Sequence, residues 1–276
     1  MSRPLMVADS SCDVNEEILE RTGIRRVPFT LIANDHVYID DETMDISVFL
    51  DDVAASEQVT GSAAMGPQAF MQAAGDAQEI FIFTITSHLS STFNNAMLAA
   101  TELREKGRKV HVFNTESASA GETSYMMRVQ EMIEAGLSFE EIVAREEEIV
   151  RTNVTYFILD DYSTLIKSGR LPRLAGRILS TLSIRPVCRG VNGEIGIRTV
   201  ARGMDNAIRK LAEAILSENM PFAERTLYIT HIQAPERARQ VCEMVEKLVS
   251  FGRVVILEGG GLNAAYANFG GIVIGF

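Results

Sequence analysis

The sequence predicts an α/β fold in two parts: an N-terminal doubly wound domain with a mostly parallel sheet, and a C-terminal α+β domain, with a ligand cleft between them. In residues 1–160, apolar runs of strand length alternate with helix-like segments, which is the pattern of a parallel sheet covered by helices. The run "EIFIFTIT" is apolar without interruption, as expected for a strand buried on both faces. In residues 161–276 the strand-like pieces are shorter, and two of them flank the turn signal Asn192-Gly193.

Each element of the first domain has a local signal. "PLMVADSSCDV" predicts a buried strand that ends in a polar loop, and the helix after it stops at Gly23. Residues 24–42 alternate around an Asn-Asp turn and predict a small hairpin insert. "DISVFLDDVAAS" predicts an amphipathic helix, and Pro67 favours the start of the next one. Apolar strands are expected at 79–86 and 109–117, each followed by a helix.

The second domain has signals of mixed type. "LIKSGRLPRLAGRILSTL" predicts a basic helical stretch, and helices are also expected for "MDNAIRKLAEAILS" and "APERARQVCEMVEKLVS". The apolar runs "TLYITHI", "RVVILE" and "GIVIGF" predict strands. Helices and strands in this order are typical of an α+β domain.

The composition limits the classes of partner. The chain has 276 residues, 46% of them hydrophobic, with 26 Lys+Arg against 37 Asp+Glu and a net charge of −11. This charge argues against binding to nucleic acid or to an anionic membrane. The cysteines Cys12, Cys188 and Cys242 are far apart and indicate a reducing, cytoplasmic compartment. The chain shows no signal peptide and no apolar run of about 20 residues, so we expect no stable membrane insertion.

The stretch "TITSHLSSTFNNAMLAA", from Thr84 to Ala100, contains six hydroxyl side chains within its first nine residues. They could supply a nucleophile, a helix cap or a seat for an anion. The stretch lacks the glycines of a G-x-S-x-G nucleophile elbow, which argues against a serine hydrolase. Capping of the following helix by Ser90 or Ser91 is expected, and a helix N-terminus can also hold an anion.

Nucleotide and metal sites have weaker support. "VVILEGGGLNAAYANFGG" imitates a strand, Gly-rich turn and helix, but only "IVIGF" follows it, so we expect no βαβ unit and no nucleotide there. The four histidines are scattered, and the acidic cluster around residues 40–45 is expected to be a solvated loop. The sequence therefore predicts no metal site.

Polar residues recur where the predicted parallel strands end. Residues 9–11, 86–92 and 115–119 all follow such strands, and ligands of doubly wound domains bind at that edge. With Arg170, these hydroxyl and backbone donors suit a carboxylate or phosphate head group. Met-rich helices such as "SYMMRVQEMI" are expected to be core, or alternatively an adaptable tunnel for a flexible chain.

Together these segments resemble the DegV family of bacterial fatty-acid-binding proteins along the whole chain. "VADSSCDV" is similar to the opening strand and Asp-Ser loop of that family, and "TSHLSSTFNNA" to its Ser-x-Leu-Ser-Gly-Thr-Tyr segment. "VTGSAAMGP" stands where the family has Thr-Ser-Gln-Pro-Ser. Other similar segments follow in the family's order: "VFNTESASAGE", "YSTLIKSGRLPRLAG", "SIRPV" and "TVARGMDNAIRKL".

The resemblance implies which residues hold a ligand. In such proteins a Thr, a Ser and a His hold the fatty-acid carboxylate, and an Arg lies near the mouth of the site. By position the Thr is Thr60, the Ser is Ser90 and the Arg is Arg170. The family ends in His-x-Gly-Pro-Gly and a final strand, whereas this chain ends in "AAYANFGGIVIGF". Counting back from Phe276 places Tyr266 at the position of the His. Tyrosine can donate one hydrogen bond but cannot carry the positive charge of a protonated histidine.

Four further hydroxyl residues are expected close to this head group. Ser62 follows Thr60 in the same segment, and Ser10 lies in the opening Asp-Ser loop. Ser91 and Thr92 follow Ser90 and are expected mostly to cap the helix that begins there.

The resemblance also implies the function. It describes the lipid-binding subunit of a bacterial fatty-acid kinase, which is not an enzyme by itself and needs no cofactor other than its bound fatty acid. The subunit buries a long-chain fatty acid and presents its carboxylate to the catalytic subunit of the kinase. Arg170, with Lys167, Arg173 and Arg177, would dock that partner or else form a solvated helix face.

Three alternatives stay open. Ser90 or Ser10 could be the nucleophile of a hydrolase or transferase. The changes near Tyr266 could mean a paralogue that binds a different lipid-like ligand. The chain could also be a regulatory protein with an empty cleft.

Overall fold

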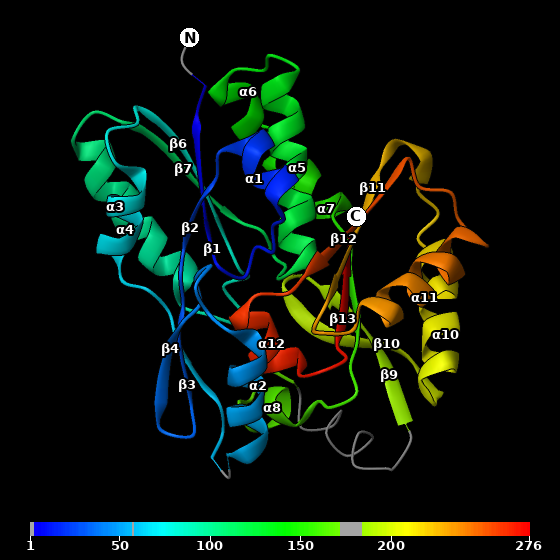
Figure 1. Cartoon of the computed structure of the whole chain (residues 1–276). Coiled ribbons are helices and arrows are strands. Elements are labelled where there is room, and N and C mark those ends of the chain that lie inside the picture. Colours follow the sequence, from blue (N-terminus) through cyan, green and yellow to red (C-terminus); the bar gives the residue numbers. More distant parts are fainter. Residues whose placement is uncertain (1–2, 57, 172–183) are drawn as a thin grey trace.

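The first sheet consists of four parallel strands in the order β2-β1-β6-β7. The computed structural model, drawn in Figure 1, describes residues 3–56, 58–171 and 184–276. The central strands β1 and β6 are almost entirely buried, as the uninterrupted apolar runs predicted. The four strands are β1 (Leu5–Asp9), β2 (Arg25–Val27), β6 (Glu79–Thr84) and β7 (Lys109–Asn114).

Helices cover both faces of this sheet (Figure 1). On the outer face α3 and α4 pack together against the strands, while α5 covers the inner face. The expected start and stop signals are present: Asn15 caps α1 by accepting from the N–H of Ile18, Gly23 ends it at φ 63°, and Pro67 opens α3. The helices of this part are α1 (Glu16–Thr22), α3 (Pro67–Ala74), α4 (Thr92–Glu105), α5 (Ala120–Glu134), α6 (Phe139–Val143) and α7 (Glu146–Thr152).

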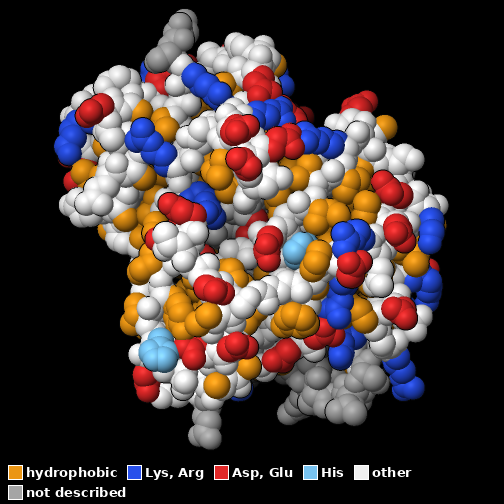
Figure 2. Space-filling model, in the orientation of Figure 1, with side chains coloured by type: hydrophobic (Ala, Val, Ile, Leu, Met, Phe, Trp, Pro, Cys, Tyr) orange, Lys and Arg blue, Asp and Glu red, His pale blue; other side chains and the backbone are white. Residues whose placement is uncertain are grey.

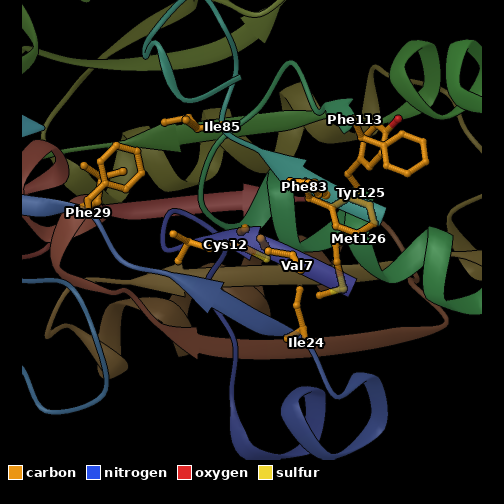
Figure 3. Packing of buried hydrophobic residues seen from close by; sticks show 14 of the residues in the cluster. Val7, Cys12, Ile24, Phe29, Phe83, Ile85, Phe113, Tyr125 and Met126 are labelled. Atoms are coloured by element: carbon orange, nitrogen blue, oxygen red, sulfur yellow. The ribbon is translucent and has the colours of Figure 1, made fainter. Parts of the chain in front are cut away.

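An aromatic cluster joins the first sheet to α5 (Figure 3). Phe83 and Phe113 stack with ring centres 5.1 Å apart, and Tyr125 of α5 lies 5.6 Å from Phe113. All three side chains are fully buried. In the same view Phe29 and Ile85 lie at the opposite end of the sheet from this cluster. The hydrophobic core therefore extends along the sheet to the carboxyl ends of its strands, and burial of this area is its main stabilisation.

The second sheet is mixed, with six strands in the order β10-β9-β8-β13-β11-β12. β11 and β12 are parallel, and every other neighbouring pair is antiparallel. Because β8 belongs to this sheet, sheet membership changes before residue 160, and the limits 1–160 and 161–276 remain predictions. The strands are β8 (Thr155–Ile158), β9 (Ile184–Val191), β10 (Glu194–Arg202), β11 (Thr226–His231), β12 (Arg253–Glu258) and β13 (Ile272–Gly275).

Helix α5 also packs on the inner face of the second sheet, so it lies between the two sheets (Figure 1). A Cβ at Gly275 would lie 2.1 Å from the carbonyl oxygen of Ala120, so only glycine allows β13 to approach α5 this closely. Helices α10 (Met204–Leu216) and α11 (Pro235–Glu246) cover the outer face, and η1 (Phe222–Glu224) is a short 3₁₀ turn. The fold class predicted from the sequence is thus confirmed.

A third, smaller sheet lies beside the space between the two large ones, in the order β4-β3-β5. β3 and β4 form a hairpin across Asn34 and Asp35, which both have positive φ. Helices α2 and α12 pack against β3, and α8 packs against α12. These elements are β3 (Thr30–Ala33), β4 (His36–Ile39), β5 (Gly61–Ala63), α2 (Ile46–Ala55), α8 (Ser163–Lys167) and α12 (Gly261–Ala267).

Two further expectations concern the membrane and the basic stretch. Within residues 3–56, 58–171 and 184–276, no helix combines the length and apolarity that crossing a membrane requires. Most of the basic stretch, including Arg173 and Arg177, lies outside the described residues, so their role in docking a partner stays a prediction.

Candidate functional site

A cavity opens between the first sheet, the second sheet and α12. It contains about 1100 Å³ of empty space, part of which is continuous with solvent. Loops after β6 and β7 line one side of it, strand β8 and helix α12 line the other, and the tip of the β9–β10 hairpin completes the wall. The sequence predicted two of these segments, because 86–92 and 115–119 follow parallel strands. The position agrees with the general rule for doubly wound folds.

Most of the cavity wall is apolar. Large aliphatic and aromatic side chains from several elements and loops converge on it, which gives a surface suited to a hydrocarbon chain. These side chains include Phe29, Ile85, Leu89, Phe157, Leu159 and Leu262. The Met-rich helix α5 contributes no residue to the lining described here, and its Met126 and Met127 are buried in the core. The default interpretation of those methionines as core residues is the one that fits the structure.

A pair of hydroxyl groups lies at one place in this wall. The Ser62 and Tyr266 hydroxyl oxygens are 2.7 Å apart, and both side chains line the cavity. Ser62 is the middle residue of β5, so its side chain faces α12 while its neighbours face away. Two hydroxyls in contact provide two donors and several acceptor positions, which can be shared with a third polar group.

Arg170 supplies the positive charge next to this pair. Its guanidinium carbon lies 5.3 Å from the centre of the Tyr266 ring, a cation–π arrangement. The Nε–H group donates to the carbonyl oxygen of Leu89 at 3.3 Å. Of the described residues that line the cavity, Arg170 alone is cationic, whereas Glu116 and Glu194 are acidic. An anionic head group would therefore favour the end that Arg170 occupies.

The roles of helix capping and cavity lining are distributed among Ser90, Ser91 and Thr92 differently from what the sequence predicted. The Ser90 hydroxyl lies 2.8 Å from that of Thr92 and accepts from the N–H of Thr92 at 3.3 Å, so Ser90 itself caps α4. Ser91 stands at the N-cap position but its side chain makes no capping bond. Ser90 and Ser91 both line the cavity, whereas Thr92 is fully buried and does not.

Thr60 and Ser10 lie away from the cavity. Thr60 is buried and lines a separate pocket, beside Val59, Lys167 and Phe269. Ser10 donates from its hydroxyl to Asp40 at 2.7 Å and accepts from the N–H of Phe29 at 3.0 Å. Both bonds of the Ser10 hydroxyl hold the loop after β1 to the chain near Phe29.

The sequence analysis did not identify the hairpin tip as part of the site. The Thr86 hydroxyl donates to the carbonyl oxygen of Gly193 at 3.0 Å, and His88 Nδ1 lies 3.4 Å from a carboxylate oxygen of Glu194. Ser117 and Thr155 form another hydroxyl pair at 2.5 Å. These contacts join the first sheet's loops to the second sheet, and no local pattern in the sequence indicates which loop a distant hairpin will touch.

Buried carboxylates fix helix α12, and with it Tyr266. Asp40 accepts from the N–H groups of Gly261 and Leu262 at 2.5 and 2.9 Å. Asp13 accepts from the N–H of Gly260 at 2.9 Å and from the Asn263 side-chain amide at 2.8 Å. The partial positive charge of a helix N-terminus favours carboxylates at this position. Burial raises the pKa of Asp13 and of Asp40, and these hydrogen bonds act in the opposite direction.

Two more acids lie behind them. Burial raises the pKa of Asp9 to about 7, although the N–H groups of Ile85 and Ser11 donate to it and lower it. Glu122 is fully buried in the first turn of α5, and neither of its carboxyl oxygens has a hydrogen-bond partner among the residues described. Burial, and then the nearby charge of Asp9, hold the pKa of Glu122 well above its usual range, which favours the neutral form of this side chain.

The other chemical interpretations find little geometry to support them. None of the described histidines forms a hydrogen bond with Ser90 or Ser10, so the structure shows no nucleophile–base pair for a hydrolase. β13 is antiparallel to β11, so the Gly-rich turn before α12 is not part of a βαβ unit. Within the part of the chain that the structure describes, no three potential metal ligands are grouped.

The fold and the cavity define a class: a two-part α/β protein that can enclose an apolar chain with a polar group at one end. The family model described as "Uncharacterised protein, DegV family" matches residues 5–275, and the chain belongs to the DegV family. It is 32% identical to a DegV domain-containing protein of Streptococcus pyogenes serotype M1, with 98% of each chain covered. The resemblance seen in the sequence is therefore confirmed.

Solved structures of similar proteins contain fatty acids. A DegV family protein of Ruminococcus gnavus, refined with vaccenic acid, has a TM-score of 0.94 at 29% identity over 99% of each chain. The Fatty Acid Kinase (Fak) B3 protein of Streptococcus pneumoniae, loaded with linoleic acid, has a TM-score of 0.91 at 27% identity, covering 100% of this chain and 99% of that one. Membership of a family of fatty-acid-binding proteins agrees with the prediction that the chain is not an enzyme.

The buried acid Glu122 leads to a prediction about pH. Because its pKa is raised in the folded state, its contribution to stability is fully present below about pH 4.3 and decreases as the pH rises toward the folded-state pKa. Glu122→Gln removes the titrating group, so the free energy of unfolding should fall less steeply with pH, by up to about 1.4 kcal/mol per pH unit. Urea unfolding between pH 5 and 8 measures this slope.

Glu102→Gln, at an exposed position of α4, is the matched control and should follow the wild type. Parallel slopes for Glu122→Gln and the wild type would show that Glu122 does not hold a proton in the folded protein.

Proposed function

We propose that the chain binds one long-chain fatty acid, with the acyl chain along the apolar wall and the carboxylate beside Ser62, Tyr266, Ser90 and Arg170. The observation that carries this proposal is the amphiphilic cavity itself. Its wall is mostly hydrocarbon, and hydroxyls and a single guanidinium meet at one place in it. A molecule that fits must be apolar along most of its length and anionic at one end.

The charge distribution favours a carboxylate over a larger anion. Arg170 is already engaged with Leu89 and the Tyr266 ring, so it can stabilise one charge without being free to surround a phosphate. The Ser62–Tyr266 pair donates hydrogen bonds without adding charge. Ser90 adds a third hydroxyl at the N-terminus of α4, whose partial positive charge acts in the same direction.

The proposed partner is the catalytic subunit of a fatty-acid kinase, to which the bound carboxylate would be presented. Support comes from the similarity to the Streptococcus pneumoniae Fatty Acid Kinase (Fak) B3 protein. The site suits this role because Ser90, Tyr266 and Arg170 are only partly buried, so the head group lies close to the protein surface. The three cysteines are free, which suits the reducing cytoplasm.

Denaturing extraction of the purified protein, followed by mass spectrometry, tests the ligand directly. We expect about one fatty acid per chain, because an apolar cavity of this size gains by being filled. A stoichiometric lipid of another class would instead identify a paralogue with a different ligand. An empty protein that shows no thermal shift with added fatty acids would contradict the proposal.

Mutation can distinguish the contributions of Thr60 and Ser62, both in the segment before α3, to ligand binding. Ser62→Ala should raise the dissociation constant for a fatty acid by about tenfold or more, because one hydrogen bond to a charged group is worth ~1.5–3 kcal/mol. Thr60→Val, which keeps the shape of a residue outside the cavity, should leave the constant nearly unchanged. Isothermal titration calorimetry measures both. A larger effect at Thr60 would place the head group in the neighbouring pocket.

The role of Arg170 depends on the charge of the ligand. Arg170→Gln should weaken oleic acid binding more than oleyl alcohol binding, since only the acid is anionic. Lys167→Gln is the control, because Lys167 is an exposed cation of α8 that does not line the cavity. Competition with a fluorescent fatty acid gives both affinities. Equal losses for the acid and the alcohol would mean that Arg170 supports the wall rather than the carboxylate.

A further inference from the structure

The small sheet β4-β3-β5 has an unusually apolar outer face. Ile32, Val37 and Ile39 are 44%, 66% and 46% exposed. In the β3–β4 ladder Ile32 pairs with Val37, and Ile39 pairs with Thr30, two residues from Ile32. The three side chains therefore project from the same face. We call them the hairpin patch. In Figure 2 hydrophobic side chains gather at the lower left, where Figure 1 places β3 and β4.

The other face of the same sheet forms part of the site. Leu31 is fully buried, and Tyr38 packs on Phe49 of α2 with ring centres 5.1 Å apart. Ser62 of β5 pairs with Leu31, so its hydroxyl points to the cavity side. On the outer side, a Cβ at Gly61 would lie 3.6 Å from that of Ile32. Only the thickness of one sheet separates the hairpin patch from the head-group pair.

Charge limits what can cover the hairpin patch. Residues 28–63, which contain the small sheet and α2, include no Lys or Arg. Asp35 in the hairpin turn, and Asp41 and Glu42 directly after β4, are wholly or partly exposed and form an acidic border at the two ends of β4. An anionic membrane surface would be repelled by this border, and so would a second copy of the same acidic segment. A protein surface with an apolar centre and a border of Lys and Arg complements it.

We propose that the hairpin patch docks a protein partner of this complementary kind, namely the protein that acts on the bound carboxylate. The inference rests on the proposed function, in which that protein is the catalytic subunit of a fatty-acid kinase. Docking on the outer face of the sheet that carries Ser62 brings the partner next to the head group without covering the cavity wall. Steering by the acidic border makes the association faster and sensitive to salt.

The double variant Val37→Thr/Ile39→Thr tests this surface. Threonine keeps the β-branched shape that suits a strand while removing apolar contact area. The full-length protein, loaded with oleic acid, is immobilised, and the kinase catalytic subunit of the same organism is the probe in biolayer interferometry. The variant should bind the probe at least about tenfold more weakly, and its oleic acid affinity should be unchanged. Wild-type binding should weaken as salt is raised from 50 to 500 mM.

Two further variants make the result specific. Leu98→Gln changes a residue of α4 that is 59% exposed but lies outside the hairpin patch, and it should bind the probe like the wild type. Ile32→Thr is a second patch variant and should reproduce the loss, which excludes an effect confined to the edge strand β4.

Several outcomes would overturn the proposal. If the double variant binds oleic acid and the kinase subunit like the wild type, the hairpin patch is not the docking surface, although the proposed function stands. If the wild type carries fatty acid but does not bind the kinase subunit, both this surface and the kinase partnership are wrong. Sedimentation with phosphatidylglycerol vesicles, or a dimer in light scattering, that is lost in the double variant would assign the patch to a membrane or to a second copy instead.

Discussion

The structure depends on two buried carboxylates that connect distant parts of the chain. Asp13 and Asp40 accept the first backbone N–H groups of α12, a helix more than 200 residues later in the sequence. Desolvation of the two carboxylates costs much of what these charge-assisted bonds contribute. Their main effect is geometric, because they hold α12 in a single position against the loops after β1 and β4. Tyr266 can then meet Ser62, and Leu262 can form part of the cavity wall.

The proposed head-group region contains little charge. Where the resemblance places a histidine in relatives, this chain has Tyr266, whose hydroxyl is shared with Ser62 and whose ring lies against Arg170. The positive charge at this place thus comes from Arg170, in the segment after α8. The hydroxyl groups of Ser62 and Tyr266 can orient a bound group by hydrogen bonds, but they add no charge. In the proposed function, such a site would select its ligand by hydrocarbon fit and by a single anionic end.

Local sequence signals predicted most of the helices and strands. The features they did not predict depend on pairing between residues far apart in the sequence. Caps such as Asn15 and Gly23, and apolar runs such as β6, are visible within a few residues. That β8 joins the second sheet, and that the hairpin tip at Gly193 contacts Thr86, depends on residues far apart in sequence. Ser90, Arg170 and Tyr266 do line one cavity. Ser62 lines this cavity and Thr60 does not. Ser62 lies inside the short strand β5, whereas Thr60 comes before the strand begins, and the sequence alone does not show where so short a strand starts.

The place of β13 in the second sheet has a consequence for biosynthesis. This strand is synthesised after both β8 and β11, yet it lies in the interior of the sheet, between them. Until residues 272–275 have been made, β8 and β11 have no common neighbour in the second sheet. The first sheet, complete by β7, can form much earlier. The nascent chain therefore carries a complete first sheet with an open apolar side until β13 has been made.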